Sequence, residues 1–309
     1  MKAPPRILVI KLGALGDVVQ ALGPMAAIRR HHAGAEITIL TTAPFADFLA
    51  RAPYQDAIWI DERPSWRTPA GLWRLRRRLR AGRFARIYDL QTSNRSSSYF
   101  HLMGPGPRPQ WSGIARGASH PHDNPDRDRH HTIERQADQL RRAGIANVPP
   151  PDLSWVEAEI GRFALPERFV ALVPGGSPHR PQKRWPAERY AELAALLSAR
   201  GITPVTLGGD TERDLGAAIR ARCAEAIDLT GATTHADIVA IGRRALWAIG
   251  NDTGPMHLLA GSGAASTVLF SAASDPARTA PRGARVMILR RDSLADLPTS
   301  AVAATLCFG

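Results

Sequence analysis

The chain has 309 residues and an ordinary hydrophobic content of 44%, which suits two domains, because single cores stop growing at about 250–300 residues. Its two cysteines, Cys223 and Cys307, exclude a disulfide framework and fit a reducing compartment. The net charge is +12, and residues 1–155 contain 23 Lys and Arg against 13 Asp and Glu. We therefore expect the first half to meet an anionic partner: a nucleic acid, a phospholipid surface or a phosphorylated substrate.

Neither of the two most apolar stretches predicts a leader or a membrane span. The first, residues 7–10, ends at Lys11 and is too short for the core of a signal peptide. The longest uncharged stretch, residues 256–274, is rich in Gly, Ser, Ala and Thr, whereas a spanning helix needs about 20 mainly apolar residues. We predict a helix followed by a buried strand there, and a soluble, cytoplasmic protein.

Strand-like apolar runs alternate with helical patterns along the chain, which predicts an α/β fold. The first strand is predicted at residues 6–11, and a helical pattern follows over residues 17–31. Helices between strands imply parallel sheets with right-handed crossovers. Further strands are predicted at residues 36–41, 57–60, 86–90, 169–173, 203–207, 226–229, 245–250 and 267–271.

A stiff segment, NVPPP at residues 147–151, separates the two halves of this pattern. We place the domain boundary near residue 155, which gives two βαβ domains, residues 1–155 and 156–309. Ligands of such sheets bind at the carboxyl ends of the strands. The loops that directly follow predicted strands are therefore the candidates for a functional site.

The first candidate loop is KLGALGDVV, residues 11–19. Gly13 and Gly16 permit a tight turn from strand to helix and leave Asp17 at the head of the helix. Asp17 can act as a catalytic base, or it can simply stabilise the helix N-terminus, as acidic residues commonly do. The spacing G-x-x-G-D is not the dinucleotide fingerprint G-x-G-x-x-G, which argues against a dehydrogenase.

The second candidate loop is PGGSPHRPQKRWP, residues 174–186. Gly175, Gly176 and Ser177 offer backbone amides and a hydroxyl to a phosphate. Lys183 and Arg184 add the positive charge that a diphosphate leaving group needs. The alternative is a long loop that is anchored by its tryptophan.

The third candidate loop is GGDTER, residues 208–213. Glu212 can accept hydrogen bonds from ribose hydroxyls, as carboxylates do in many nucleotide sites. The alternative is a helix start at which Asp210 or Thr211 is the capping residue.

The fourth candidate loop is GNDTGPMHLLAGSG, residues 250–263, which follows a predicted strand. Asp252, Thr253 and Gly254 precede Pro255, a residue that suits the first turn of a helix. The N-terminal amides of that helix would point at a phosphate. A turn so rich in small and polar residues is hard to explain by packing alone.

Together and in this order, KLGALGDVV, PGGS…KRWP, GGDTER and NDTGPMHLLAG resemble the lipopolysaccharide core heptosyltransferases of glycosyltransferase family nine, over nearly the whole chain. The resemblance implies a GT-B architecture of two facing Rossmann-like domains. Residues 1–155 would bind the acceptor and residues 156–309 the nucleotide-sugar donor. It also implies inverting transfer that needs neither a metal nor a cofactor.

The resemblance assigns roles to individual residues. Asp17 falls at the position of the general base, and Lys183 at that of a lysine that contacts the donor phosphates. Gly13 and Gly16 belong to the loop on the acceptor side, and no residue is assigned to a metal. The positions that match donor-binding residues are Ser177, Glu212, Asp252, Thr253, Gly254 and His257.

Two segments depart from the family pattern. Residues 178–182, PHRPQ, look like an insertion between Ser177 and Lys183, and they bear on the phosphate contacts of Ser177. Residues 90–100, LQTSNRSSSYF, lack the glycine that we expect after the fourth strand. This second departure bears on the identity of the acceptor.

Two further segments have open interpretations. Residues 66–86 predict a basic helix with Leu72, Leu75 and Leu79 on one face. Such a helix can lie on an anionic membrane, or can pack its leucines inward and leave its arginines in solvent. Residues 119–131 could form a metal or manganese-binding D-x-D site, but we favour a loop without fixed ligand geometry. Its candidate ligands are His120, His122, Asp126, Asp128, His130 and His131.

The function that we predict is transfer of a sugar, a heptose from ADP-heptose, onto a lipopolysaccharide core or a related anionic glycolipid. Asp17 would take the proton of the acceptor hydroxyl, and Lys183 would stabilise the diphosphate with the amides of Thr253 and Gly254. The enzyme would be peripheral on the inner face of the cytoplasmic membrane, with no nucleic-acid partner. The alternatives are a nucleotide-sugar epimerase or hydrolase on the same fold, and a non-catalytic basic protein that binds membrane or nucleic acid.

Overall fold

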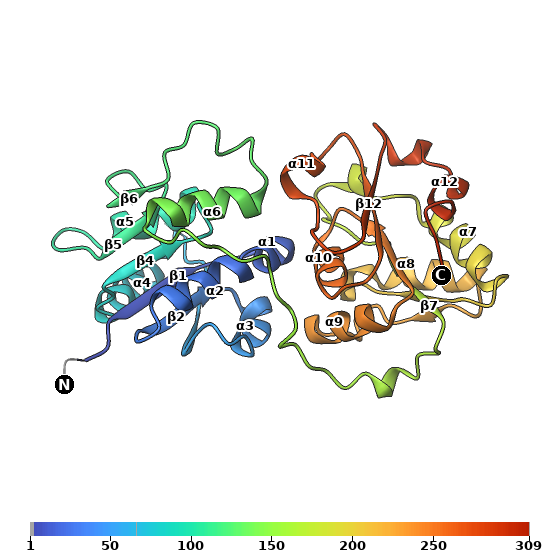
Figure 1. The fold of residues 1–309 in the computed structure, drawn as a ribbon, viewed down its shortest axis with the longest axis horizontal. Coiled ribbons are helices and arrows are strands. Elements are labelled where there is room, and N and C mark those ends of the chain that lie inside the picture. The colour runs from blue at the N-terminus through green and yellow to red at the C-terminus, as the bar shows by residue number, and fades with distance from the viewer. Residues whose placement is uncertain (1–2, 66, 309) are drawn as a thin grey trace. The chain divides into compact units, whose positions relative to one another are not determined.

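The computed structural model describes residues 3–65 and 67–308 and divides the chain into two compact units, Met1–Trp155 and Val156–Gly309 (Figure 1). Each unit contains one six-stranded sheet, and every strand pair in both sheets is parallel. The predicted α/β fold class with parallel sheets is confirmed. Trp66, the first residue of the predicted basic helix, lies outside the described residues.

In unit 1 the strands lie in the order β3-β2-β1-β4-β5-β6. This is the order of the doubly wound dinucleotide-binding sheet, in which the topological switch point lies between β1 and β4. Loops that follow these two strands therefore lie where ligands bind in such sheets. The strands are β1 (Arg6–Ile10), β2 (Glu36–Thr41), β3 (Ala57–Ile60), β4 (Arg86–Asp89), β5 (Gln110–Gly113) and β6 (His120–Pro121), and the helices are α1 (Leu15–Gln20), α2 (Leu22–His31), α3 (Ala43–Ala50), α4 (Pro69–Ala81), α5 (Asn94–Leu102) and α6 (Thr132–Arg142).

In unit 2 the order is β12-β11-β10-β7-β8-β9. Counted from β7, this is the same topology as in unit 1, with the switch point between β7 and β10. The strands are β7 (Phe169–Val173), β8 (Thr203–Thr206), β9 (Ile227–Asp228), β10 (Trp247–Asn251), β11 (Ser266–Phe270) and β12 (Val286–Arg290). The α-helices are α7 (Ala187–Ser198), α8 (Arg213–Arg222), α9 (His235–Arg244), α10 (Gly254–Gly261), α11 (Pro276–Thr279) and α12 (Thr299–Ala303), and the short 3-10 turns are η1 (Gly161–Phe163), η2 (Pro181–Lys183), η3 (Asp210–Glu212) and η4 (Leu294–Asp296).

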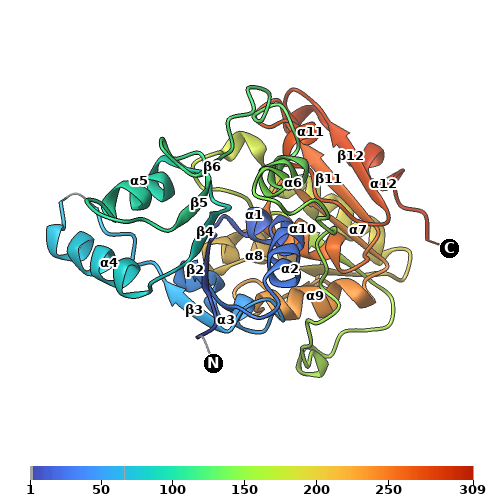
Figure 2. The ribbon, with the colours of Figure 1, turned by 60° about the vertical axis from the view of Figure 1, so that its left-hand side comes forward.

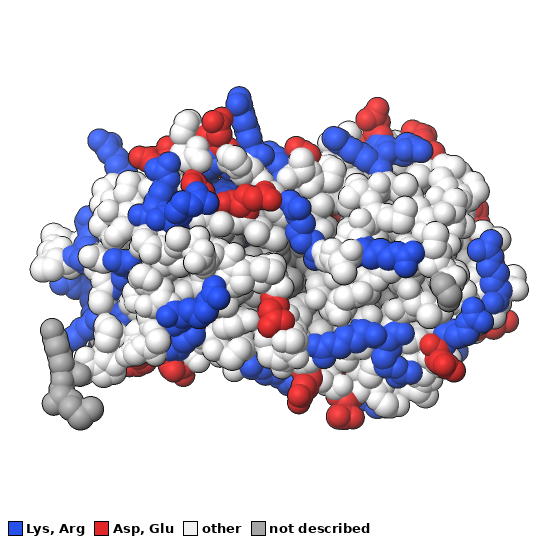
Figure 3. All heavy atoms as spheres, in the orientation of Figure 1, with Lys and Arg blue, Asp and Glu red and all other residues white. Residues whose placement is uncertain are grey.

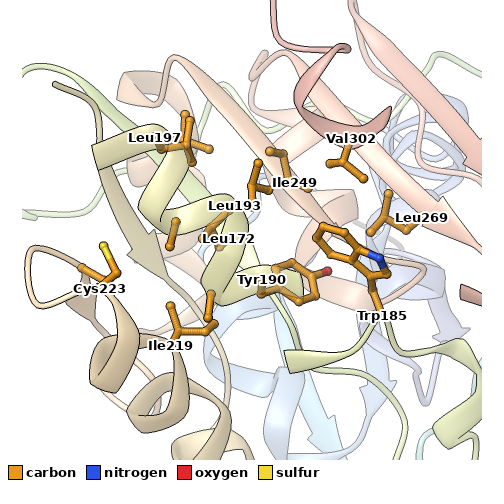
Figure 4. Packing of buried hydrophobic residues seen from close by; sticks show 14 of the residues in the cluster. Leu172, Trp185, Tyr190, Leu193, Leu197, Ile219, Cys223, Ile249, Leu269 and Val302 are labelled. Carbon is orange, nitrogen blue, oxygen red and sulfur yellow. The ribbon is translucent and has the colours of Figure 1, made fainter. Parts of the chain in front are cut away.

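The core of unit 2 explains why its central strands are apolar without alternation. Leu172 of β7 and Ile249 of β10 belong to the same buried cluster as Leu193 and Leu197 of α7 (Figure 4). Trp185 and Tyr190 fill the space nearer the ends of the strands. The opposite face of the sheet is covered as well, because α9 and α10 contact each other and α10 contacts both β10 and β11. A strand that is buried on both faces has no solvent-exposed face, so its sequence does not alternate between apolar and polar residues.

One core cluster of unit 1 lies between its sheet and the helices α4 and α5. Leu8, Ile87 and Trp111 of the strands pack with Leu75 and Leu79 of α4. Helix α4 thereby turns one face inward and leaves the other outside, and Figure 2 places it at the outer edge of its unit. The predicted basic helix is confirmed over residues 69–81 and not over the whole of 66–86, because β4 begins at Arg86. Of its three predicted leucines, Leu75 and Leu79 are buried and Leu72 is half-buried.

The predicted strands are confirmed to within two residues at each end, as is the predicted helix followed by a strand over residues 256–274. Strands β5, β6 and β12 were not predicted: β5 and β6 are short and carry polar residues, and β12 is an exposed edge strand. The single helix predicted over residues 17–31 is wrong. Two helices form there, because the Pro24 ring would clash with the Gln20 carbonyl in a continuous helix.

None of the helices within the described residues is both long enough and apolar enough to cross a membrane.

Candidate functional site

Asp17 lies in the first turn of α1, directly after the turn that follows β1. Its Oδ2 atom accepts a hydrogen bond from the backbone amide of Ala14 at 3.3 Å, and the residue is half-buried. Gly13 has a φ of +127°, and a Cβ atom there would lie 2.7 Å from the Phe45 ring. Only glycine fits this turn, as the sequence predicted, while Gly16 is buried within α1. Asp17 therefore stabilises the helix start and also remains partly open to solvent.

Two fully buried charges, Lys11 and Asp89, lie beside this turn, one at the end of each strand that borders the switch point. Lys11 Nζ donates to the Leu90 carbonyl at 3.2 Å, and burial lowers the pKa of Lys11, while Asp17 and Asp89 act in the opposite direction. The Asp89 Oδ1 atom accepts from the amides of Gln91 and Thr92 at 3.1 and 2.9 Å. Neither charge was predicted as functional, although a charged residue at the carboxyl end of a strand is a signal that could have found them.

The loop after β4, whose sequence departs from the family pattern, is tied to the loop after β1. The Leu12 amide donates to Gln91 Oε1 at 2.8 Å. Thr92 has a φ of +45°, in the left-handed region that glycine adopts more readily than other residues. Ser93 then caps α5 by accepting from the Ser96 amide.

We expect the stability of the wild-type chain, relative to Asp89→Asn, to fall as the pH rises from about 4 to about 6.5. Burial raises the pKa of Asp89 from 3.8 to about 6, against the hydrogen bonds and Lys11, which lower it. The unfolded chain releases this proton near pH 4 and the folded chain near pH 6, so roughly 3 kcal/mol is lost across that window. Urea unfolding of both proteins at a series of pH values measures this loss of stability. If the difference in unfolding free energy between the two proteins stayed constant with pH, the raised pKa of Asp89 would be contradicted.

In unit 2, Lys183 and Asp252 form an ion pair at the switch point. Lys183 lies at the end of η2 and Asp252 directly follows β10, and Lys183 Nζ lies 2.6 Å from Asp252 Oδ2. The two side chains are only 13% and 8% exposed. The sequence predicted both residues as functional, but not that they bind each other. The carboxylate holds the ammonium in place, and two of its N–H groups remain for a further acceptor.

Asn251 is a buried residue that positions the loops around this pair. Its Oδ1 atom accepts from the Trp185 amide at 2.9 Å and from the Tyr190 hydroxyl at 3.2 Å. Its Nδ2 atom donates to the carbonyls of Pro174 and Gly175 at 2.8 and 3.0 Å. The loop after β7, the start of α7 and the end of β10 are therefore held together by one amide side chain. No role was predicted for Asn251 from the sequence.

Glu212 joins two of the predicted loops. Its carboxylate oxygens accept from the amides of Gly176 and Gly209, both at 2.8 Å. A Cβ atom on Gly175 would lie 1.7 Å from Glu212 Oε1, so this approach requires glycine. The Gly176 amide, predicted to face a phosphate, is bound to Glu212 instead, and that part of the prediction is wrong. The Glu212 oxygens keep one lone pair each for a ribose hydroxyl.

The alternative interpretation of the GGDTER loop, a helix start, is correct except for the capping residue. Gly209, not Asp210 or Thr211, is the N-cap of η3, and Glu212 is the N-cap of α8. Asp210 pairs with Arg213 at 2.7 Å on the surface.

The remaining donor-side residues lie at the start of α10 and in the loop after β7. Thr253 is the N-cap of α10, but its hydroxyl makes no capping hydrogen bond, and Gly254 is the first residue of the helix. His257 is buried one turn further on, with an exposed fraction of 7%. Ser177 is exposed, and its carbonyl accepts from the Arg180 amide at 3.0 Å. No side chain caps the start of α10. Pro255 has no N–H, and the Met256 amide donates to the Thr253 carbonyl at 3.2 Å, so the amides of Thr253 and Gly254 are the ones left for an incoming anion.

The histidine- and aspartate-rich segment, residues 119–131, is held by ion pairs. His122 Nε2 lies 3.1 Å from Asp138 Oδ2. Asp126 pairs with Arg129 and Asp128 with Arg127. His131 is the N-cap of α6. Within residues 3–65 and 67–308, no three His, Cys, Asp or Glu side chains are grouped as metal ligands would be.

Fold and site together define a class of protein. Both units have the Rossmann strand order. Unit 2 has a lysine and a helix start without a side-chain cap at its switch point, and the Glu212 carboxylate in the loop after the neighbouring strand. This is the GT-B class of glycosyltransferase fold, with features suited to a nucleotide diphosphate.

The comparisons with known proteins identify the family. The family model described as glycosyltransferase family 9 (heptosyltransferase) matches residues 72–302. The chain belongs to this family and is a glycosyltransferase. The two alternatives, a nucleotide-sugar epimerase or hydrolase and a non-catalytic basic binding protein, are therefore corrected.

Individual relatives agree with this family. A lipopolysaccharide core heptosyltransferase, OpsX of Haemophilus influenzae, is 23% identical over 300 residues, which cover 91% of this chain and 82% of the relative. The solved structure of E. coli ADP-heptose LPS heptosyltransferase II has a TM-score of 0.79 and 22% identity, and covers 97% of each chain. That of E. coli heptosyltransferase WaaC with ADP has a TM-score of 0.75 and 19% identity, over 97% of this chain and 98% of the other. At these identities the solved structures show the shared fold.

Proposed function

We propose that this glycosyltransferase transfers a heptose from ADP-heptose to an anionic glycolipid of the lipopolysaccharide core type, with inversion at the anomeric carbon and without a metal ion. Unit 2 binds the donor and unit 1 the acceptor. The observation that carries the donor assignment is the nearly buried Lys183, held by Asp252 after β10. The names of the relatives, which are heptosyltransferases and include one solved with ADP, support the sugar and the nucleotide.

The proposed reaction is a single displacement. The acceptor hydroxyl attacks the anomeric carbon, its proton passes to Asp17, and the bond from that carbon to the diphosphate oxygen breaks. ADP leaves with the electron pair. Proton transfer of this kind contributes about 10²–10⁴-fold to the rate. Lys183 and the backbone amides of Thr253 and Gly254 stabilise the charge that develops on the diphosphate, so no cofactor is part of the proposal.

Charge supports an anionic acceptor. Residues 1–155 carry most of the net positive charge of the chain, and a phosphorylated core glycolipid is attracted to arginines. Because the lipid of such an acceptor lies in a bilayer, the enzyme works at the inner face of the cytoplasmic membrane.

Incubation of the purified enzyme with ADP-heptose and a heptose-deficient core glycolipid tests this function. We expect ADP release and a product heavier by one heptose only when both substrates are present, with inverted configuration by NMR and full activity in the presence of a chelator. Donor turnover that is equally fast without acceptor would instead indicate a hydrolase or an epimerase. Loss of activity with the chelator would refute metal independence alone.

A further inference from the structure

The outer face of α4 combines arginines with an exposed tryptophan. Residues 63–88 contain nine arginines and no Asp or Glu. Trp73 is 58% exposed, and Arg74 and Arg77 are exposed on the same side of the helix, as their spacing of one turn dictates. In Figure 3 basic side chains gather at the edge of unit 1 where Figure 1 places α4.

The arginines of α4 divide into two groups. Arg76 and Arg80 donate to the backbone carbonyls of Gly104 and Met103, and Arg78 lies over the Trp59 ring at 4.3 Å, so these three support the fold. The other two point outward.

Arg74 and Arg77, the two outward-pointing arginines, make only weak contacts with the rest of the protein. Arg77 lies 5.5 Å from the centre of the Trp73 ring, which keeps the two side chains together on the surface. Arg74 lies 3.8 Å from Glu62, but both side chains are well exposed, at 65% and 77%, so this ion pair is weak. The guanidinium groups of Arg74 and Arg77 can therefore leave these contacts and bind another anion at little cost in free energy.

A hollow of about 440 Å³ borders the end of the same helix. Three of its lining residues are arginines, Arg80, Arg83 and Arg108, and most of the others are apolar, among them Phe84 and Met103. A lining of this kind suits a phosphodiester that has an apolar chain attached to it, because guanidinium groups bind phosphate and the apolar walls pack against hydrocarbon.

We propose that this α4 surface, made of Trp73, Arg74, Arg77 and the hollow lined by Arg80, Arg83 and Arg108, docks on an anionic phospholipid bilayer. Trp73 enters the interface between headgroups and acyl chains, where tryptophan is favoured. Arg74 and Arg77 bind headgroup phosphates, and Arg83 and Arg108 do so at the hollow, whereas Arg80 keeps its bond to the Met103 carbonyl. A nucleic acid would use the arginines but would leave the apolar hollow unfilled. The inference rests on the proposed glycolipid acceptor, because docking brings unit 1 to the surface that contains that lipid.

Sedimentation with vesicles tests the α4 surface. We expect binding to phosphatidylcholine vesicles that contain phosphatidylglycerol and none to phosphatidylcholine alone. Arg74→Gln/Arg77→Gln should weaken binding about 25-fold, since each arginine near such a surface contributes about fivefold. The matched control is Arg220→Gln/Arg222→Gln on α8, which removes two exposed arginines from unit 2 and should leave binding almost unchanged. An equal loss in both variants would overturn the proposal.

Fluorescence quenching tests the tryptophan separately. Lipids with brominated acyl chains should quench the wild-type protein, and Trp73→Phe should remove most of that quenching, whereas Leu196→Ala, at another exposed apolar residue, should not. Unchanged quenching in Trp73→Phe, or tighter binding to duplex DNA than to the anionic vesicles, would overturn the proposal. Neither assay contains donor or acceptor, so vesicle binding and heptosyl transfer can fail independently of each other.

Discussion

Asp17→Asn is expected to lower the rate of transfer by about 10²–10⁴-fold while ADP binding stays unchanged. The asparagine oxygen can still accept the hydrogen bond that the Ala14 amide donates to Asp17, so the turn after β1 keeps its structure. What the variant loses is a group that can take the proton of the acceptor hydroxyl. Single-turnover transfer and calorimetric titration with ADP measure the two effects separately.

The matched control for this prediction is Asp47→Asn. Asp47 is exposed on α3 in the same unit, and its replacement removes the same charge without touching the switch point. We expect it to transfer heptose at the wild-type rate. Full activity in Asp17→Asn, or an equal loss in both variants, would remove Asp17 from the mechanism and leave it as a residue that stabilises the start of α1.

Lys183→Met is expected to weaken ADP binding and to lower kcat/KM about 10²–10³-fold, because the developing charge on the diphosphate loses a positioned cation. The same change leaves the Asp252 side chain, only 8% exposed, without its partner. Breaking a buried pair from one side destabilises a protein by about 3 kcal/mol or more, so urea unfolding should show a lower stability of unit 2.

A second substitution separates the two effects. In Lys183→Met/Asp252→Leu the unpaired carboxylate is gone, so most of the stability should return, while transfer should remain low. Arg189→Gln, which breaks the exposed pair with Glu192, is the control and should cost less than about 1 kcal/mol. If the double variant regained transfer together with stability, Lys183 would act through the fold and not on the donor.

The amino-acid sequence alone predicted the fold class, most strands and the loops that carry the candidate residues. The strand at residues 169–173 was predicted with its observed bounds, because a strand buried on both faces is a continuous apolar run. The strand at residues 36–41 was also predicted with its observed bounds, although Thr38 and Thr41 interrupt its apolar residues. The motif residues follow from local chemistry in the same way. Gly13 has a backbone conformation that glycine favours, and Pro255 occupies the first turn of α10. Each of these features depends on a few neighbouring residues.

Only the tertiary structure decided which polar groups bind each other. Lys183 pairs with Asp252, 69 residues away, and Glu212 takes the Gly176 amide, 36 residues away. Lys11 and Asp89 meet because β1 and β4 are neighbours in the sheet. These partners come together through the order of the strands, which no local pattern encodes. A donor or acceptor that looks open in the sequence can therefore already be satisfied in the fold.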